Sequence, residues 1–269
     1  MGVRSQAYTP RMAFLKLDGA DLFYTDHGGD GPPLVLIHAA AGTSACWVHQ
    51  LPAFSAAGYR VVTYDLRNFG RSTAQPGHEN DGSIATDLLA LVTQLNLPPF
   101  FLLGTAYGGF GALEFACDHP DLLRGLVLST SFGGLTDPEY TALRAVYVPA
   151  DLAARPTVEK ELGATYRKAD PEGVERFLAM EHDSYRGDGA RQPLGRPLTL
   201  DRVSKITVPT LVISADEDVY APPPVMGAIA DRIPGARFEI VSGAGHSAYW
   251  EQPEAWNALV LNFCRPLRG

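Results

Sequence analysis

Two residues suited to acid–base chemistry, Asp218 and His246, each stand just after an apolar run near the end of the chain. Asp218 lies in "ADEDVYAPP" after "PTLVIS", and His246 lies in "AGHSAYWEQPE" after "FEIVSG". A histidine can act as a general base near neutral pH because its ordinary pKa is about 6.5. A carboxylate bonded to its far nitrogen fixes the imidazole tautomer and stabilises the imidazolium. The pair therefore predicts proton-transfer chemistry, with Asp216 and Glu217 as rival acids in the same loop.

Three earlier apolar runs also end in stretches that could shape a site. "PLVLI" is followed by "HAAAG", "RVVTY" by "DLRNFGRS", and "FFLL" by "GTAYGG", which covers residues 104–109. The small residues of this last stretch are what a sharp turn from a strand into a helix requires. In open α/β sheets, ligands bind outside the carboxyl ends of the strands. We therefore expect all five stretches to meet at one edge of a sheet.

No metal or other cofactor is indicated by the residue types that could bind one. The remaining histidines have no second ligand at the spacing of a metal site. The cysteines are Cys46, Cys117 and Cys264, an odd number at wide spacing without a CxxC pair. This pattern predicts reduced thiols rather than a disulfide framework or a zinc site.

The elements that must position these residues follow from the apolar pattern. Most of the runs are apolar almost throughout, as expected for strands buried on both faces. They cover residues 33–39, 60–66, 100–106, 125–130, 209–215 and 237–243. Helical spacing of apolar residues lies between them, at 45–58, 83–97 and 108–120, and follows the last of them at 253–264. Residues 13–31 are typical of a hairpin with Asp-Gly turns. The whole pattern predicts an α/β fold with a mostly parallel central sheet flanked by helices.

Residues 135–204 differ from this pattern. They contain helix-like pieces such as "DPEYTALRAVY" and "PEGVERFLAMEHDSY" and no strongly strand-like run. We interpret them as a helical cap inserted between two strands. Residues 1–134 and 205–269 would then form the core.

The order of these loops resembles the α/β-hydrolase superfamily over nearly the whole chain. "GTAYGG" matches the nucleophile elbow of that family, G-x-S-x-G, except that Ala106 stands where the serine is expected. "HAAAG" and "DLRNFGRS" are similar to a His-Gly strand end and an Asp-x-x-Gly-x-Gly-x-Ser loop of the family, with Ala39 and Asn68 in place of glycines. The resemblance implies an α/β-hydrolase fold of a capped esterase, lactonase or C–C hydrolase type.

The resemblance also implies roles for single residues. Asp218 and His246 would be the acid and the base of a catalytic triad. The backbone N–H groups of Ala40 and Tyr107 would form the oxyanion hole, for which side-chain identity matters little. We expect the pocket to be lined by residues of the cap and of adjoining loops, among them His38, Tyr147, Tyr185, Tyr220 and Trp250. A substrate carboxylate could be received by Arg144, Arg186 or Arg191.

Ala106 itself cannot attack a substrate, because acyl transfer through a covalent intermediate requires an activated hydroxyl, thiol or carboxylate. Three explanations stay open. We favour a serine-type ester, lactone or C–C hydrolase whose nucleophile has been replaced and is thereby inactivated. Alternatively, a native alanine belongs to a ligand-binding receptor, or to an enzyme in which Asp218 and His246 work alone as a base, as in cofactor-independent oxygenases.

The composition limits the partners. The chain of 269 residues has a formal net charge of −8 and a pI near 5.3. A nucleic acid or an anionic membrane would require a basic surface, so we expect neither partner. No stretch approaches the roughly 20 apolar residues that span a bilayer. We expect a cytoplasmic protein, monomeric or homodimeric, that acts on a small molecule.

Overall fold

The central sheet follows the predicted pattern of strands. The computed structural model describes residues 9–78, 81–186 and 191–268. Within them, nine strands form one sheet in the order β1-β2-β4-β3-β6-β7-β8-β9, with β5 paired to β2. The strands are β1 (Arg11–Leu17), β2 (Ala20–Asp26), β3 (Pro33–Ile37), β4 (Arg60–Tyr64), β5 (Thr73–Ala74), β6 (Phe100–Thr105), β7 (Leu123–Ser129), β8 (Thr210–Ala215) and β9 (Arg237–Val241). The β1–β2 hairpin and the β2–β4 pair are antiparallel, and the pairs from β4 to β9 are parallel. The predicted fold class is confirmed.

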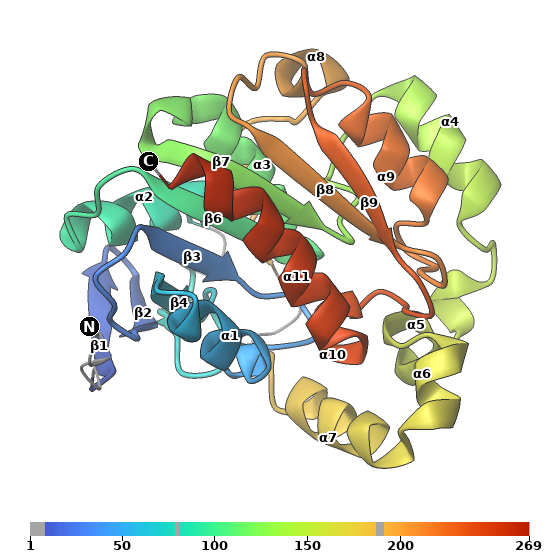
Figure 1. Cartoon of the computed structure of the whole chain (residues 1–269), viewed down its shortest axis with the longest axis horizontal. Coiled ribbons are helices and arrows are strands. Elements are labelled where there is room, and N and C mark those ends of the chain that lie inside the picture. Colours follow the sequence, from blue (N-terminus) through green and yellow to red (C-terminus); the bar gives the residue numbers. More distant parts are fainter. Residues whose placement is uncertain (1–8, 79–80, 187–190, 269) are drawn as a thin grey trace.

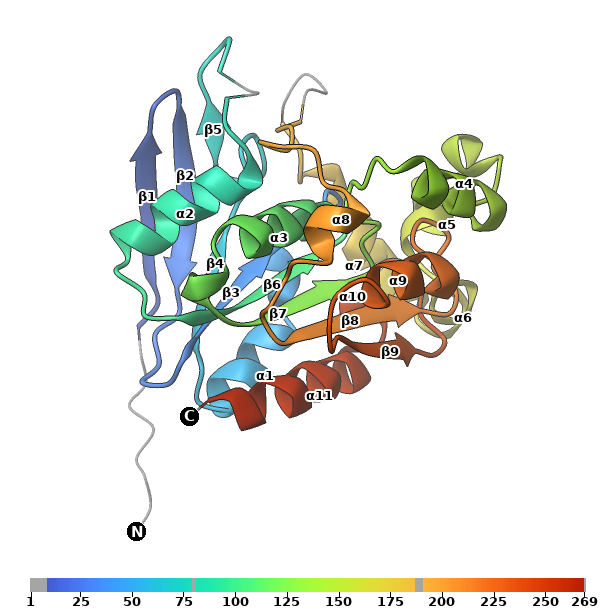
Figure 2. The ribbon, with the colours of Figure 1, turned by 90° about the horizontal axis from the view of Figure 1, so that it is seen from above.

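Helices cover both faces of this sheet. They are α1 (Gln50–Ala56), α2 (Ile84–Gln94), α3 (Tyr107–Asp118), α4 (Pro138–Tyr147), α5 (Thr157–Glu161), α6 (Ala164–Ala169), α7 (Pro171–His182), α8 (Leu200–Val203), α9 (Pro223–Ala230), α10 (Ala248–Glu251) and α11 (Pro253–Cys264). Short 3-10 turns are η1 (Ser44–Trp47), η2 (Pro120–Leu122), η3 (Leu152–Ala154) and η4 (Arg265–Leu267). Figure 2 shows α2, α3 and α9 on one face and α1 and α11 on the other.

The two-sided core explains why the strands are apolar throughout. In β3, Val35 and Ile37 belong to the cluster under α2 and α3, whereas Leu34 and Leu36 belong to the cluster under α1 and α11. All four side chains are fully buried. Successive side chains of a strand point to opposite faces, so a strand covered on both faces needs an apolar residue at every position.

The sheet has a topological switch point between β3 and β6. From β3 the chain crosses to β4 on one side, and β6 then returns to pair with β3 on its other side. The loops that leave β3 and β6 therefore diverge, which opens a crevice at their carboxyl ends. The stretches "HAAAG" and "GTAYGG" begin at this crevice.

The chain between β7 and β8 supplies helices α4 to α8. Figure 1 shows α4, α5, α6 and α7 beyond the carboxyl ends of the strands. Within the described residues, one isolated bridge joins this segment to the rest of the chain, Phe69 with Tyr185, and another, Leu135 with Leu198, lies inside the segment. The division into a core and a cap at residues 135 and 204 stays a prediction. Among the described residues, no helix is long and apolar enough to cross a membrane.

Candidate active site

Ala106 occupies a strained turn between β6 and α3. Its φ is 49° and its ψ is −116°, a backbone conformation that residues with a Cβ rarely adopt. Three hydrogen bonds hold it there. The Ala106 N–H donates to the carbonyl of Ser129 at 3.0 Å, and the Ala106 carbonyl accepts from the Ser131 hydroxyl at 2.6 Å and from the Gly109 N–H at 3.0 Å. The turn therefore fixes the direction in which the residue-106 side chain points.

The glycines around Ala106 are required by close backbone approach. A Cβ on Gly104 would lie 2.6 Å from the carbonyl oxygen of Gly108. A Cβ on Gly108 would lie 2.6 Å from the carbonyl oxygens of both Ile37 and His38. These distances are too short for a side chain, so α3 can pack against β3 at this point only through glycine.

Asp218 and His246 meet at the same edge of the sheet. The loop after β8 carries Asp218, the loop after β9 carries His246, and His246 Nδ1 lies 3.0 Å from each carboxylate oxygen of Asp218. Asp218 Oδ1 also accepts the N–H groups of Tyr220 at 2.8 Å and Ala221 at 3.0 Å. Both members of the pair are buried. The carboxylate is thus fixed by its own loop and orients the imidazole.

The rival acids of the sequence point elsewhere. Asp216 accepts the Gly243 N–H at 2.7 Å, and Glu217 accepts the Thr165 N–H at 2.9 Å. Their carboxylates fasten neighbouring loops and make no hydrogen bond to His246. Of the three acids in this loop, the structure brings only Asp218 against the histidine.

The surroundings of His246 favour its charged form. Burial lowers the pKa of His246, but the ion pair with Asp218 and the charges of Glu161 and Glu251 outweigh burial and raise the pKa to about 9. His246 is therefore an imidazolium at neutral pH. The ring of Tyr220 lies beside it, with 4.5 Å between ring centroids.

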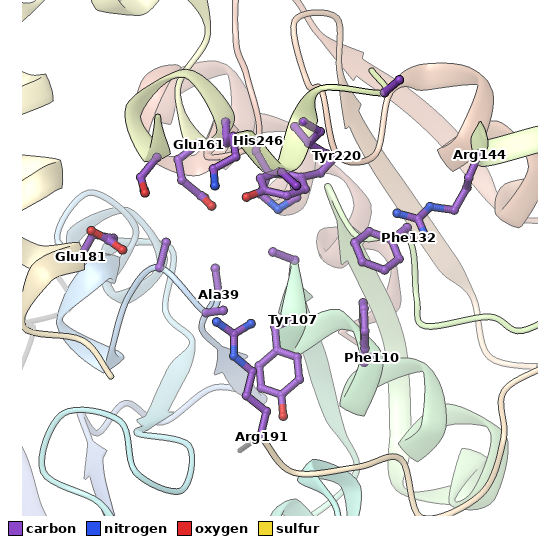
Figure 3. Close-up of a pocket in the computed structure, with 18 residues that line it drawn as sticks. Ala39, Tyr107, Phe110, Phe132, Arg144, Glu161, Glu181, Arg191, Tyr220 and His246 are labelled. Carbon is purple, nitrogen blue, oxygen red and sulfur yellow. The ribbon is translucent and has the colours of Figure 1, made fainter. Parts of the chain in front are cut away.

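A cavity of about 800 Å³ joins these features. Figure 3 shows His246 and Tyr220 on one side of it and Tyr107 and Arg191 on another. Its lining residues are Ala39, Ala40, Ala41, Ala106, Tyr107, Phe110, Phe132, Arg144, Ala150, Leu152, Ala153, Thr157, Lys160, Glu161, Glu181, Arg191, Tyr220 and His246. The volume suits a small organic molecule.

The predicted oxyanion-hole residues lie on this cavity. Ala40 follows β3, and Tyr107 is the first residue of α3. The described residues supply no hydrogen-bond acceptor to either backbone N–H. The start of a helix also carries partial positive charge. Two free N–H groups beside position 106 can therefore stabilise a negative oxygen of a bound ligand.

A family model described as the alpha/beta hydrolase fold matches residues 32–253, which is most of the chain. The chain belongs to the α/β-hydrolase family. A Mycobacterium tuberculosis protein, provisionally named a non-heme bromoperoxidase, is 32% identical over 251 residues, which cover 88% of this chain and 95% of that protein. The malate-bound thermophilic esterase from Thermogutta terrifontis has a TM-score of 0.81 and 26% identity, and the match covers 96% of this chain and 100% of that one. The enol-lactonase from Burkholderia xenovorans LB400 has a TM-score of 0.76 and 25% identity, with 94% and 100% coverage.

His38, predicted to line the pocket of this α/β-hydrolase chain, is instead a structural residue. It is fully buried and does not reach the cavity. Its Nε2 accepts the Leu66 N–H at 3.0 Å, so its Nδ1 carries the proton and donates to the Ala39 carbonyl at 2.7 Å. Burial lowers the pKa of His38, which keeps it neutral. The side chain ties the loop after β3 to the loop after β4.

Three further residues predicted to line the pocket also lie away from it, and Tyr220 alone of the five lines it. Tyr147 ends α4 and is 47% exposed. Tyr185 packs on the ring of Phe69 at 4.8 Å between centroids, and Trp250 is buried against Phe177. Tyr185 and Trp250 therefore serve packing, and sequence alone does not separate packing residues from lining residues.

Two of the three candidate arginines line the cavity. The guanidinium of Arg144 lies 3.8 Å above the ring of Phe132, and its buried Nε has no hydrogen-bond partner within the described chain. Arg191 lies over the ring of Tyr107. Arg186 is exposed, away from the cavity.

Sequence reasoning missed two buried carboxylates next to His246. Glu161 lines the cavity, and Glu251 lies behind the histidine loop. Glu251 accepts the N–H groups of Gly245 at 2.9 Å and Gly163 at 2.8 Å. Glu251 lies within the quoted stretch "AGHSAYWEQPE" but was not singled out there, and no motif marks Glu161. Among the described residues, no cluster of three or more His, Cys, Asp or Glu side chains is arranged to hold a metal ion.

Proposed function

We propose that this site hydrolyses an ester or a lactone of a small, negatively charged organic molecule, and that position 106 is the position of the nucleophilic residue. The observation that carries the proposal is the convergence of the strained turn at Ala106, the free N–H groups of Ala40 and Tyr107, and the buried Asp218–His246 pair on one cavity. A pocket that only bound a ligand would need neither the strain nor the oriented histidine.

The chemistry follows from these positions once a serine stands at 106. Its hydroxyl would attack the carbonyl carbon, and neutral His246 would take the hydroxyl proton. Asp218 would orient the imidazole and stabilise the imidazolium. The N–H groups of Ala40 and Tyr107 would hold the developing oxyanion. With Ala106, this covalent route is closed, and the site binds its substrate without forming an acyl-enzyme.

Charge in the cavity supports an anionic substrate. Arg144 and Arg191 both line it, and neither forms an ion pair with a described carboxylate. A buried guanidinium edge without a partner is costly, and a substrate carboxylate would satisfy it with charge-assisted hydrogen bonds. Names of relatives agree with this class, since one is a lactonase and another is an esterase solved with malate bound. Cleavage of a C–C bond next to a ketone would use the same groups.

The test is Ala106→Ser with a panel of 4-nitrophenyl esters and lactones, each neutral or bearing a carboxylate. We expect serine to raise turnover well above that of the unaltered chain, and kcat/KM to favour the carboxylate-bearing members by about 10-fold or more, the value of one charge-assisted hydrogen bond. Turnover should rise with pH up to about 9, because His246 must be neutral to act as a base. Ala150→Ser, which adds a hydroxyl elsewhere on the same cavity wall, is the matched control and should not raise turnover.

Two outcomes would contradict the proposal. An inert Ala106→Ser protein that still binds carbonyl ligands would indicate a receptor. Oxygen consumption by the unaltered chain with an acidic heteroaromatic compound, abolished by His246→Ala, would indicate an oxygenase that uses the Asp218–His246 pair as its base.

A further inference from the structure

Glu161 presents a buried carboxylate to the cavity. It is the last residue of α5, and the residue is 8% exposed. Figure 3 shows the carboxylate beside His246 and Tyr220. One oxygen, Oε2, has no hydrogen-bond partner within the described chain. The proposed hydrolysis through a serine does not use this group.

The backbone of Glu161 is fastened to the loop that carries His246. The Ser247 N–H donates to the Glu161 carbonyl at 2.9 Å. Two residues later, the Gly163 N–H donates to Glu251, whose carboxylate also accepts the Gly245 N–H. Hydrogen bonds to the residues before and after His246 thus fix the position of Glu161 relative to the histidine. Although α5 belongs to the segment between β7 and β8, this part of the segment is anchored to the active-site loop.

A carboxylate in this position is costly to keep. No described lysine or arginine forms an ion pair with Glu161. The imidazolium of His246, already paired with Asp218, favours the ionised carboxylate most, and Lys160 does so less. Burial raises the pKa of Glu161, and His246 opposes that rise. A side-chain hydrogen bond with Tyr220 offsets part of the cost of removing this carboxylate from water, but Oε2 stays without a partner in the described chain. A packing role would therefore be served better by an apolar residue.

We propose that Glu161 is a catalytic general base that activates water for direct attack on the substrate carbonyl above Ala106. This inference rests on the proposed function. The methyl group of Ala106 carries no nucleophilic atom, and Glu161 lines the same cavity as Ala106. His246, protonated at rest, serves as the acid rather than the base.

Hydrolysis of an ester by this route consumes one water molecule and uses Glu161 as the base and His246 as the acid. The Glu161 carboxylate takes a proton from water while the water oxygen bonds to the carbonyl carbon, and the carbonyl oxygen becomes an oxyanion held by the N–H groups of Ala40 and Tyr107. The tetrahedral intermediate expels the alkoxide, which takes the proton of the His246 imidazolium and leaves as alcohol. The carboxylic acid product departs. The proton on Glu161 passes to neutral His246, which restores both groups.

The test compares Glu161→Gln in two backgrounds, the unaltered chain and Ala106→Ser. The substrate is a carboxylate-bearing 4-nitrophenyl ester at saturating concentration. In the unaltered chain, we expect slow turnover that falls at least about 100-fold with Glu161→Gln, as for loss of a general base. In the Ala106→Ser background, the serine replaces the water, so the same substitution should cost less than about 10-fold. Glu159→Gln, an equal change at an exposed position two residues earlier, is the control and should change neither rate.

The pH profiles of the two backgrounds supply a second readout that a structural role would not produce. The groups facing His246 are Asp218 and Tyr220 from one loop, Glu161 from α5 and Glu251 from α10. Turnover of an alkyl ester by the unaltered chain should fall as pH rises through about 9, because the alkoxide leaving group needs the proton that His246 then lacks. Turnover by Ala106→Ser should rise over the same range.

Several results would overturn the role of Glu161. Equal losses in both backgrounds, with a lowered unfolding midpoint, would assign it to structure. An unaltered chain without turnover, beside an active Ala106→Ser protein, would refute the water route and leave the proposed function standing. If both backgrounds are inert, the proposed function fails together with the inference. An acyl adduct on the unaltered chain, seen by intact-protein mass spectrometry, would also exclude direct attack by water.

Discussion

Replacing Asp218 by asparagine should change how the stability of the fold depends on pH. In the intact pair, His246 has a pKa of about 9, against 6.5 for an unperturbed histidine. Burial by itself would lower the pKa of His246, and Asp218 is the main group that reverses this effect. Asp218→Asn removes the negative charge while keeping the shape of the side chain. We expect the pKa of His246 to fall toward or below 6.5.

The sign and size of the effect follow by linkage. A histidine whose pKa is raised in the folded state adds stability that is complete below pH 6.5 and is lost as pH rises through about 9. The rise corresponds to roughly 3 kcal/mol, at about 1.4 kcal/mol for each pH unit. The unaltered chain should therefore exceed Asp218→Asn in stability by this amount near pH 6, and the gap should close above pH 9. Burial raises the pKa of Glu251 to about 7 and the charge of Asp218 adds to that rise, so Asp218→Asn should also lower the pKa of Glu251.

The assay is urea unfolding followed by tryptophan fluorescence at pH 6, 7.5 and 9.5, with the His246 ring proton titrated by NMR. Asp216→Asn is a matched control, because Asp216 is in the same loop and carries the same charge but bonds to Gly243 rather than to His246. Its stability difference from the unaltered chain should be constant over this range. Parallel pH curves for the two variants, or a His246 proton that titrates near 6.5 in the unaltered chain, would refute the reasoning.

Two further predictions concern the framework of the site. Ala106→Gly should raise the free energy of unfolding by about 1 kcal/mol, since relief of a conformation that costs about 1–3 kcal/mol exceeds the entropy cost of glycine; a lower urea midpoint would show that the turn is unstrained. Arg67→Met should lower the free energy of unfolding by about 3–5 kcal/mol. The buried Asp87 would lose an ion pair at 2.8 Å and keep only the hydrogen bond from Gln192. Adding Asp87→Leu should recover much of this loss in thermal unfolding, and a double variant no better than the single one would contradict the ion-pair explanation.

The sequence predicts the sheet well because burial on both faces requires an uninterrupted run of apolar residues in each central strand. It does not predict β5, which has two residues, or α9, whose first turn begins with prolines and follows directly on the Asp218 loop. At the level of single loops, Asn68 is informative. It stands where the family loop that it resembles has glycine. Its φ of 62° shows that the backbone is still left-handed at this position, which asparagine tolerates better than most residues.

The cavity wall could not be predicted in the same way. Residues that follow strands share an edge by topology, so Asp218, His246 and Ala106 can be placed together from their sequence positions. The segment between β7 and β8 has no such constraint. Glu159 and Glu161 are the same residue type two positions apart on one short helix, yet one faces solvent and the other faces the cavity. Only the packing of α5 against the His246 loop separates them.

Position 106 carries an alanine in surroundings that suit a nucleophile. This mismatch limits the reactions that the site can perform. A glycine would adopt this backbone more easily, so the strained turn is maintained at a cost whatever side chain it carries. Its effect is to aim position 106 at the cavity and to present the N–H of Tyr107 beside that of Ala40. A carbonyl bound there is polarised even when no side chain can attack it. Water is then the available nucleophile, and a base must activate it. His246 cannot be that base, because it is charged at neutral pH. The carboxylate of Glu161, whose Oε2 has no partner within the described chain, is the group we propose for that role. Replacing Glu161 therefore tests the alanine-bearing site more directly than any substitution in the Asp218–His246 pair.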